Sequence, residues 1–224
     1  MKQAMLRFSA VAILAGVAPL GAQQAVFDGG SPSTIAINTG SNISYLRLAN
    51  GFSLVSPASV SSVRFWGSLS SAFSGSIDWQ FFTDNSGIPG TVLASGSATP
   101  LITATGLNNA SGSSISQFAF SSGLVNLNSG IFWLALHDGS STSDNTNRGL
   151  SWSTATGGQT RPYSMFTFQN PSDPNQTWSS CNSDCFPNAF ELSGPTTAPE
   201  PSSIVLLASG MVGFIPIARR KRLL

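Results

Sequence analysis

The sequence predicts an all-β fold: an antiparallel β-sandwich of the jelly-roll type, between an N-terminal signal peptide and a C-terminal transmembrane helix. Three observations lead there. Apolar and polar residues alternate with a period of two in several short segments, and Gly, Pro, Asn and Ser separate these segments. No stretch between the two ends keeps a helical period of 3.6 beyond one turn. Only 8% of the residues are charged, as is typical of membrane segments and of secreted β domains.

The expected sandwich covers residues 25–193. In one segment Ile77, Trp79 and Phe81 share a face, while Asp78 and Gln80 share the other. Residues 131–136 are apolar on both faces, which is typical of a central strand. About 170 residues can bury close to 70% of their unfolded surface, so one core suffices. The predicted strands include 63–66, 77–82, 91–94, 115–120, 131–137 and 163–168.

Residues 1–22 have the features of a secretory signal peptide. Lys2 and Arg7 form a basic start, and residues 8–20 form an apolar run that is too short to span ~30 Å of hydrocarbon comfortably. The small residues Gly21 and Ala22 offer a cleavage point, and the cut is expected between Ala22 and Ala25. The alternative is a buried N-terminal helix.

The C-terminus carries a membrane-sorting pattern. A Pro/Thr linker at 194–201 contains Pro199, Glu200 and Pro201, and residues 202–218 follow without a charge. As a helix this stretch reaches about 26 Å, the short end of a transmembrane span. The tail at 219–224 is basic, and the positive-inside rule keeps it in the cytoplasm, which places residues 23–201 outside the inner membrane. Its cations are Arg219, Arg220, Lys221 and Arg222.

This order of a Pro-Glu-Pro tripeptide, an apolar stretch and an Arg-rich end resembles the PEP-CTERM sorting signal, over residues 198–224. The resemblance implies processing by an exosortase, a membrane transpeptidase-like enzyme of Gram-negative bacteria that make exopolysaccharide. It also implies that the membrane helix is transient. The alternative is a plain single-span anchor.

A second resemblance concerns residues 82–93. Asp84-Asn85-Ser86-Gly87 and the following Pro-Gly are turn sequences, because Gly supplies positive φ and Pro presets φ. The pattern F-x-D-x-x-G-x-P-G-x-x-L, with I-F-W-L-A-L further on, is similar to a sandwich domain common in PEP-CTERM and other secreted bacterial proteins. No activity of that domain is carried over, so the resemblance supports the fold alone.

The two cysteines, Cys181 and Cys185, are separated by three residues in a chain expected to be exported. A local disulfide that pins a loop is expected, worth about 2 kcal/mol. A redox pair needs two intervening residues, and a zinc site needs two further ligands, whereas the chain has one His.

The residues available for catalysis are few. His137 ends an apolar strand and precedes Asp138, so it is either a base oriented by a carboxylate or a strand-end histidine, and we favour the second. Residues 138–147 could hold Ca²⁺ but match no known loop pattern, and a solvated loop is favoured. No enzyme activity, cofactor or metal is therefore expected. A glycosidase pair is conceivable among Asp78, Asp84, Asp138, Asp144 and Asp173.

Tryptophan supplies the remaining functional signal. Trp66, Trp79 and Trp133 lie in strand-like segments, so we expect them in the core. Trp152 and Trp178 lie in polar, loop-like surroundings. Exposed aromatic faces stack on sugar rings in carbohydrate-binding sandwiches, so these two are the candidate glycan contacts. The alternative is that each packs beneath a loop.

The expected function is a structural or adhesive role, without catalysis, at the cell surface or in an exopolysaccharide matrix. A carbohydrate-binding module is the alternative, and a secreted glycoside hydrolase a distant one. The expected partners are an exosortase, the inner membrane and exopolysaccharide. Nucleic acid is excluded, because phosphates demand clustered cations and the central region has four Arg, no Lys and eight acids.

Overall fold

The computed structural model describes residues 23–34, 41–140, 149–158, 167–170, 177–180 and 187–195. Every regular element within these ranges is a β-strand, which confirms the predicted all-β class. The described residues contain no helix long and apolar enough to cross a bilayer. The sequence-based predictions for residues 1–22, for 196–224 and for Cys181 and Cys185 lie outside the described residues.

One sheet has seven strands: β1 (Gln23–Asp28), β3 (Ser41–Asn42), β5 (Ala58–Leu69), β8 (Leu101–Asn108), β9 (Ser114–Leu127), β11 (Leu150–Trp152) and β15 (Phe190–Pro195). The long strand β5 lies at its centre. β15 and β11 pair with one edge of β5, and β9 pairs with the other. β1 continues the sheet beyond β15, β3 beyond β11 and β8 beyond β9, all antiparallel.

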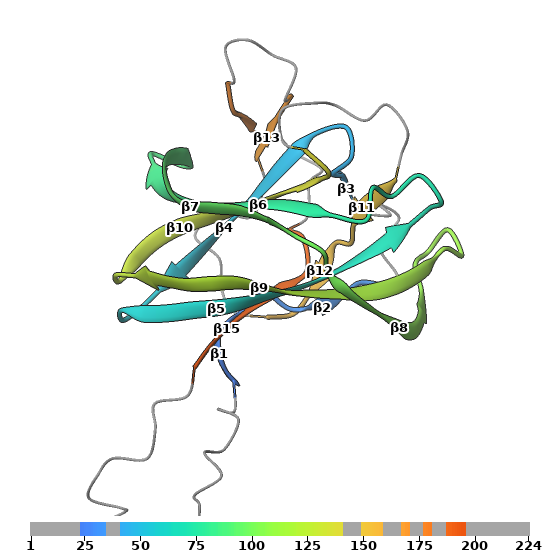
Figure 1. Ribbon diagram of the computed structural model, residues 1–224, viewed down its shortest axis with the longest axis horizontal. Helices are drawn as coiled ribbons and strands as arrows, with labels where there is room; N and C mark the ends of the chain where they lie inside the picture. Colours follow the sequence, from blue (N-terminus) through green and yellow to red (C-terminus); the bar gives the residue numbers. More distant parts are fainter. Residues whose placement is uncertain are drawn as a thin grey trace, which may run out of the picture. The chain divides into compact units, whose positions relative to one another are not determined.

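The other large sheet has six strands: β4 (Arg47–Leu54), β6 (Ile77–Asn85), β7 (Ile88–Ala98), β10 (Gly130–Asp138), β13 (Thr167–Gln169) and β14 (Ser179–Ser180). Their order is β14-β13-β4-β10-β6-β7, with antiparallel pairing throughout. Figure 1 shows β6 and β7 of this sheet above β5, β9 and β15 of the seven-stranded sheet. A two-stranded ribbon of β2 (Ser31–Pro32) and β12 (Ala155–Thr156) adjoins them.

Five of the predicted strands are confirmed. Residues 63–66 lie in β5, 77–82 in β6, 91–94 in β7, 115–120 in β9 and 131–137 in β10. Of the predicted strand 163–168, only residues 167 and 168 are described, and both belong to β13. β10 pairs with β4 on one side and β6 on the other, as its apolar faces predicted for a central strand.

The core lies between the two large sheets and is unusually aromatic. Phe65 and Phe118, on neighbouring strands, stack with ring centroids 4.8 Å apart. Phe52 of β4 and Phe190 of β15 meet edge to face at 6.1 Å and so join one sheet to the other. Full burial of one such side chain stabilises the fold by roughly 1.5–3 kcal/mol. This is the face on which alternate residues of β5, β6 and β9 are apolar.

Small residues on β7 make room for Trp79. A Cβ atom at Gly96 would lie 2.7 Å from the Trp79 indole, so any larger residue there must displace the ring. Ala94 and Ala98, at alternate positions beside Gly96, pack against the same core. The edge strand β7 therefore closes the core with backbone and methyl groups.

A second, smaller cluster lies on the opposite face of β10. Trp133 and Ala135 are buried there with Ala49 of β4 and Phe82 of β6. Trp178, which precedes β14, packs against this cluster. The six-stranded sheet is therefore apolar on both faces along its centre, because residues that alternate in β10 are buried on either side.

The first and last strands of the domain are neighbours in one sheet. β1 and β15 pair antiparallel, with Gln23 and Pro195 as Cα partners. Residues Gln23–Pro195 form one compact unit, and residues 1–22 and 196–224 fall outside it. The first and last residues of this unit therefore lie on neighbouring strands of the same sheet.

Candidate functional site

A shallow hollow lies on the outer face of the seven-stranded sheet. Val63 and Phe65 of β5 point into the core, so the alternating residues Ser62, Arg64 and Trp66 lie on the outer face. Arg64 and Trp66 are only half-buried there. We call the outer surface of β5 and of the paired strands β15, β9 and β8 the outer β5 face.

Strand register arranges the outer β5 face as three cross-strand rows. The central row runs from Glu191 on β15 through Arg64 and Ala119 to Leu101 on β8. Rows on one face of a strand are about 7 Å apart, because two residues separate them. The first flanking row is Ser193, Ser62 and Ser121, and the second is Trp66, Gln117 and Thr103.

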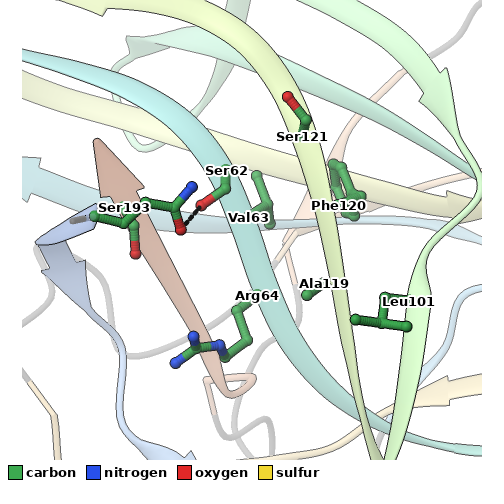
Figure 2. Close-up of a pocket in the computed structure, with 9 residues that line it drawn as sticks. Ser62, Val63, Arg64, Leu101, Ala119, Phe120, Ser121 and Ser193 are labelled. Carbon is green, nitrogen blue, oxygen red and sulfur yellow. Dashed lines mark hydrogen bonds between the residues drawn. The ribbon is translucent and has the colours of Figure 1, made fainter. Parts of the chain in front are cut away.

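The serine row and the rest of the central row beyond Glu191 line a shallow hollow of about 260 Å³. Figure 2 shows the serines grouped at one end and Arg64, Ala119 and Leu101 at the other. Leu101 is 71% exposed, which is high for a leucine on a sheet face. The lining residues are Gln23, Ser62, Val63, Arg64, Leu101, Ala119, Phe120, Ser121 and Ser193.

An ion pair lies at the centre of this face. Nη1 of Arg64 donates to Oε2 of Glu191 at 2.9 Å, and the two side chains are 41% and 20% exposed. Ser193 donates to the other carboxylate oxygen at 3.1 Å. Exposed pairs of this kind contribute little to stability, typically 0.2–1 kcal/mol. The Arg64–Glu191 pair places one donor group and one acceptor group side by side on an open surface.

Two further polar groups on this face are positioned for binding. Ser62 donates its hydroxyl hydrogen to Oε1 of Gln23 at 3.1 Å, which holds the Gln23 amide over the hollow. Nε of Arg64 is buried and has no hydrogen-bond partner in the structure. A buried donor without a partner costs about 1–3 kcal/mol of folding stability. A ligand oxygen toward which the Arg64 guanidinium moves would satisfy this donor.

Trp66 corrects a prediction. We expected it in the core, yet it is half-buried on the outer face, two residues along β5 from Arg64. The alternation of the segment 63–66 does place Trp66 opposite Phe65, so the pattern itself contained this information. The sequence-based prediction rested on the aromatic side chain of Trp66 and not on its position in the alternation.

The structure also corrects the expected exposure of Trp152. It lies on β11 and is fully buried, with Nε1 donating to the carbonyl oxygen of Ala189 at 2.8 Å. Its ring meets Phe65 and Phe190 edge to face at 6.0 and 5.9 Å. Trp152 is therefore a core residue, and no ring face is available to a sugar. Polar neighbours in sequence do not prevent this: Ser151 alternates with Trp152 on β11, and Ser153 and Thr154 are themselves buried.

Trp178 is half-buried, while Trp79 and Trp133 are buried, as expected. Its ring meets the Phe82 ring edge to face, with centroids 5.5 Å apart. Trp178 therefore contributes to the small cluster on the outer face of the six-stranded sheet, on the side of the molecule opposite the outer β5 face.

His137 and Asp138 are both buried. Nδ1 of His137 lies 3.4 Å from the Gly139 carbonyl oxygen, so in this arrangement Nδ1 carries the proton and Nε2 has no partner. Burial lowers the pKa of His137, and the nearby Arg47 guanidinium lowers it further. The hydrogen bond to Gly139 and the carboxylates of Asp138 and Asp78 act in the opposite direction.

The Asp138 carboxylate is engaged in holding segments together. It accepts from the Ser44 hydroxyl and, at 3.0 Å, from the Ser74 backbone nitrogen. Gly149 must approach this carboxylate closely, since a Cβ there would lie 2.4 Å from Oδ2.

The other described aspartates are likewise part of the framework. Asp84 accepts from Nε1 of Trp133 at 2.9 Å and from the Gly87 backbone nitrogen in the hairpin turn. Asp78 is the Cα partner of His137, and its charge acts on Arg47, raising a pKa that burial lowers. Asp144 and Asp173 lie outside the described residues.

Within the described ranges, no three His, Cys, Asp or Glu side chains lie close enough together to hold a metal ion. Comparison with protein-family models, with curated proteins and with solved structures returned no match to this chain.

Proposed function

We propose that this chain is an exported, exosortase-sorted protein of the cell surface or exopolysaccharide matrix, with a structural or adhesive role and no catalysis. The observation that carries the proposal is the pairing of β1 with β15, in which Gln23 and Pro195 are partners. A domain closed in this way has its own core between the two terminal signals. Removal of either signal therefore leaves that core intact, as stepwise processing requires.

The topology follows from the two ends. Signal peptidase cuts near residue 22, the helix 202–218 holds the precursor in the inner membrane, and the basic residues 219–224 stay in the cytoplasm. An exosortase then acts near Pro199-Glu200-Pro201 and releases the domain to the surface. For the domain we propose a jelly-roll arrangement, which is supported by the repeated crossing of the chain between the two large sheets.

The surroundings of His137, the only histidine, support the proposed absence of catalysis. His137 is buried with a lowered pKa, and the adjacent Asp138 is held by Ser44 and Ser74. A general base needs access to its substrate proton, which neither side chain has.

Mass spectrometry of surface-extracted protein tests the sorting step. We expect the mature chain to start near Gln23 and to lack residues 202–224 in a host with an exosortase. In an exosortase deletion strain, and in a variant with Pro199, Glu200 and Pro201 replaced by Ala, the full-length tail should persist at the inner membrane. A mature surface protein that ends at Leu224 in the wild-type host contradicts processing and leaves a simple anchor.

A carbohydrate-binding module is the second candidate. It is favoured by one observation, the open hollow beside Arg64, Glu191 and a half-buried Trp66.

A further inference from the structure

We propose that the outer β5 face binds a neutral polysaccharide, with Arg64 and Glu191 as its central polar contacts and Leu101 and Trp66 as its apolar ones. This inference gives the carbohydrate-binding candidate above a site and a ligand class.

The charges on this face select a neutral ligand. Arg64 and Glu191 are joined at 2.9 Å, so their charges compensate each other. An anionic sugar drawn to Arg64 would meet the Glu191 carboxylate, and like charges at such range are unfavourable. A hydroxyl group, in contrast, can accept from the guanidinium and donate to the carboxylate at once.

The surroundings of the ion pair suit a ligand rich in hydroxyls. Ser62, Ser121 and Ser193 line one side of the hollow. Their hydroxyl hydrogens are donated to Gln23, to the Ser61 carbonyl oxygen and to Glu191, so the three oxygens are left to accept from a ligand. The Gln23 side chain adds an amide with two donors and one acceptor. A polyol ring therefore finds matching donors and acceptors along its equatorial edge.

Apolar side chains lie where the C–H face of a sugar ring needs them. Leu101 is 71% exposed at the end of the central row, next to Ala119. Trp66 lies in the adjacent row, beside Gln117. Burial of exposed apolar surface gains roughly 25 cal/mol per Å², so these side chains can contribute to affinity without any charge.

The size and shape of the hollow favour one unit of a longer chain. Its volume of about 260 Å³ lies below the ~300–1,000 Å³ of pockets that enclose a drug-sized ligand. Because the central row crosses four strands and each flanking row crosses three, neighbouring units of a polymer can contact the surface on either side of the hollow. A free monosaccharide would use only part of these contacts.

Affinity gel electrophoresis tests the proposal with the full chain, purified in a mild detergent. The probes are two neutral polymers, dextran and galactomannan, and one uronic-acid polymer, alginate. We expect retardation by at least one neutral polymer, with little change at high salt because no net charge is involved. Arg64→Gln should weaken that binding about tenfold or more, the loss expected for a hydrogen bond to a charged group.

Two matched pairs of variants separate the site from general effects. Leu101→Thr should weaken binding, whereas Leu124→Thr, at a leucine 63% exposed outside the hollow, should not. Trp66→Ala should weaken binding, whereas Trp178→Ala, on the other sheet, should not. Thermal unfolding of each variant shows that it is folded at the temperature of the gel.

Three results would overturn the proposal: no retardation by either neutral polymer, retardation by alginate alone, or neutral-polymer binding that only Trp178→Ala removes. The last would move the site to the six-stranded sheet. None of these results depends on how the protein is sorted in the cell. An intact C-terminus in the mass-spectrometric experiment would in turn leave the binding result unchanged, so the two proposals fail separately.

Discussion

The Ser44 hydroxyl donates a hydrogen bond to the Asp138 carboxylate across 94 positions of sequence. The same hydroxyl accepts from the Leu150 backbone nitrogen at 2.8 Å, and the other carboxylate oxygen accepts from the Ser74 backbone nitrogen. Asp138 ends β10 in the six-stranded sheet, whereas Leu150 begins β11 in the seven-stranded sheet. This one carboxylate therefore links the two sheets at one end of the core.

Replacement of Asp138 by Ala should lower the free energy of unfolding by about 1–3 kcal/mol. The buried Ser44 hydroxyl would lose its acceptor, which costs about this much, whereas water can replace the carboxylate at the nitrogen of the exposed Ser74. Urea unfolding measures the change. Asp138→Asn should lose less, because its amide oxygen still accepts and the hydroxyl can rotate to accept from the amide. An equal loss in both variants would show that charge matters more than hydrogen bonding.

A second buried polar link joins Asn50 and Asn188. The Asn50 amide donates to Oδ1 of Asn188 at 3.1 Å, and the Asn188 backbone nitrogen donates to Oδ1 of Asn50 at 2.9 Å. Asn188 also donates to the Trp152 carbonyl oxygen at 2.7 Å. Asn50→Ala and Asn188→Ala should each cost about 1–3 kcal/mol, and the double variant should cost less than their sum. Strict additivity in a double-mutant cycle would contradict the pairing.

Stability should fall as the pH falls from about 7.5 to 5.5, because of His137. Burial lowers its pKa in the folded state below the roughly 6.5 of an unfolded chain. Between those two values the unfolded state binds more protons, so acid favours unfolding there, and the full contribution is present only above the unfolded pKa. Arg47, Asp78 and Asp138 are the charged groups that act on the ring.

His137 is the only histidine, so its ring signal in a proton NMR titration is unambiguous. A measured pKa at or above the unfolded value would refute this prediction. His137→Gln should remove most of the slope of stability against pH in this window while leaving the slope at lower pH unchanged.

The hairpin between β6 and β7 should accept a stabilising substitution. Ser86 and Gly87, its two loop residues, have φ of 54° and 92°, the signature of a type I′ turn. Serine is strained at positive φ, whereas Asn tolerates it, so Ser86→Asn should raise the free energy of unfolding by up to about 1 kcal/mol. Ser86→Val, with a branched Cβ, should lower it. Thermal unfolding compares the two, and the opposite order would contradict the turn type.

Local patterns predicted the strands well where both the alternation and the flanking turns were clear. The segment 77–82 places Ile77, Trp79 and Phe81 on one face, and the structure buries all three against the core. The Asp84–Gly87 turn follows from residue chemistry alone, because Gly provides positive φ and the Asp84 carboxylate accepts from the Gly87 nitrogen. These features depend on residues within a few positions of each other.

The tryptophans show where local patterns fail. Trp66 was expected in the core, yet it is half-buried on an outer face. Trp152 was expected at the surface, yet it is fully buried in the core. A strand offers two faces, and which face meets the opposite sheet depends on pairing partners far away in sequence. For Trp152 the deciding neighbours are Phe65 and Phe190.

The sequence by itself determined the all-β class, the positions of the main strands and the place of the β6–β7 turn, because alternation and turn chemistry act within one segment. Only the tertiary structure decided that Glu191, Arg64, Ala119 and Leu101 form one row, and that Asp138 joins two sheets. Register between strands distant in the chain sets these neighbours, and it results from how all the strands share a single core. A binding surface made of such neighbours exists only once the sheet has formed.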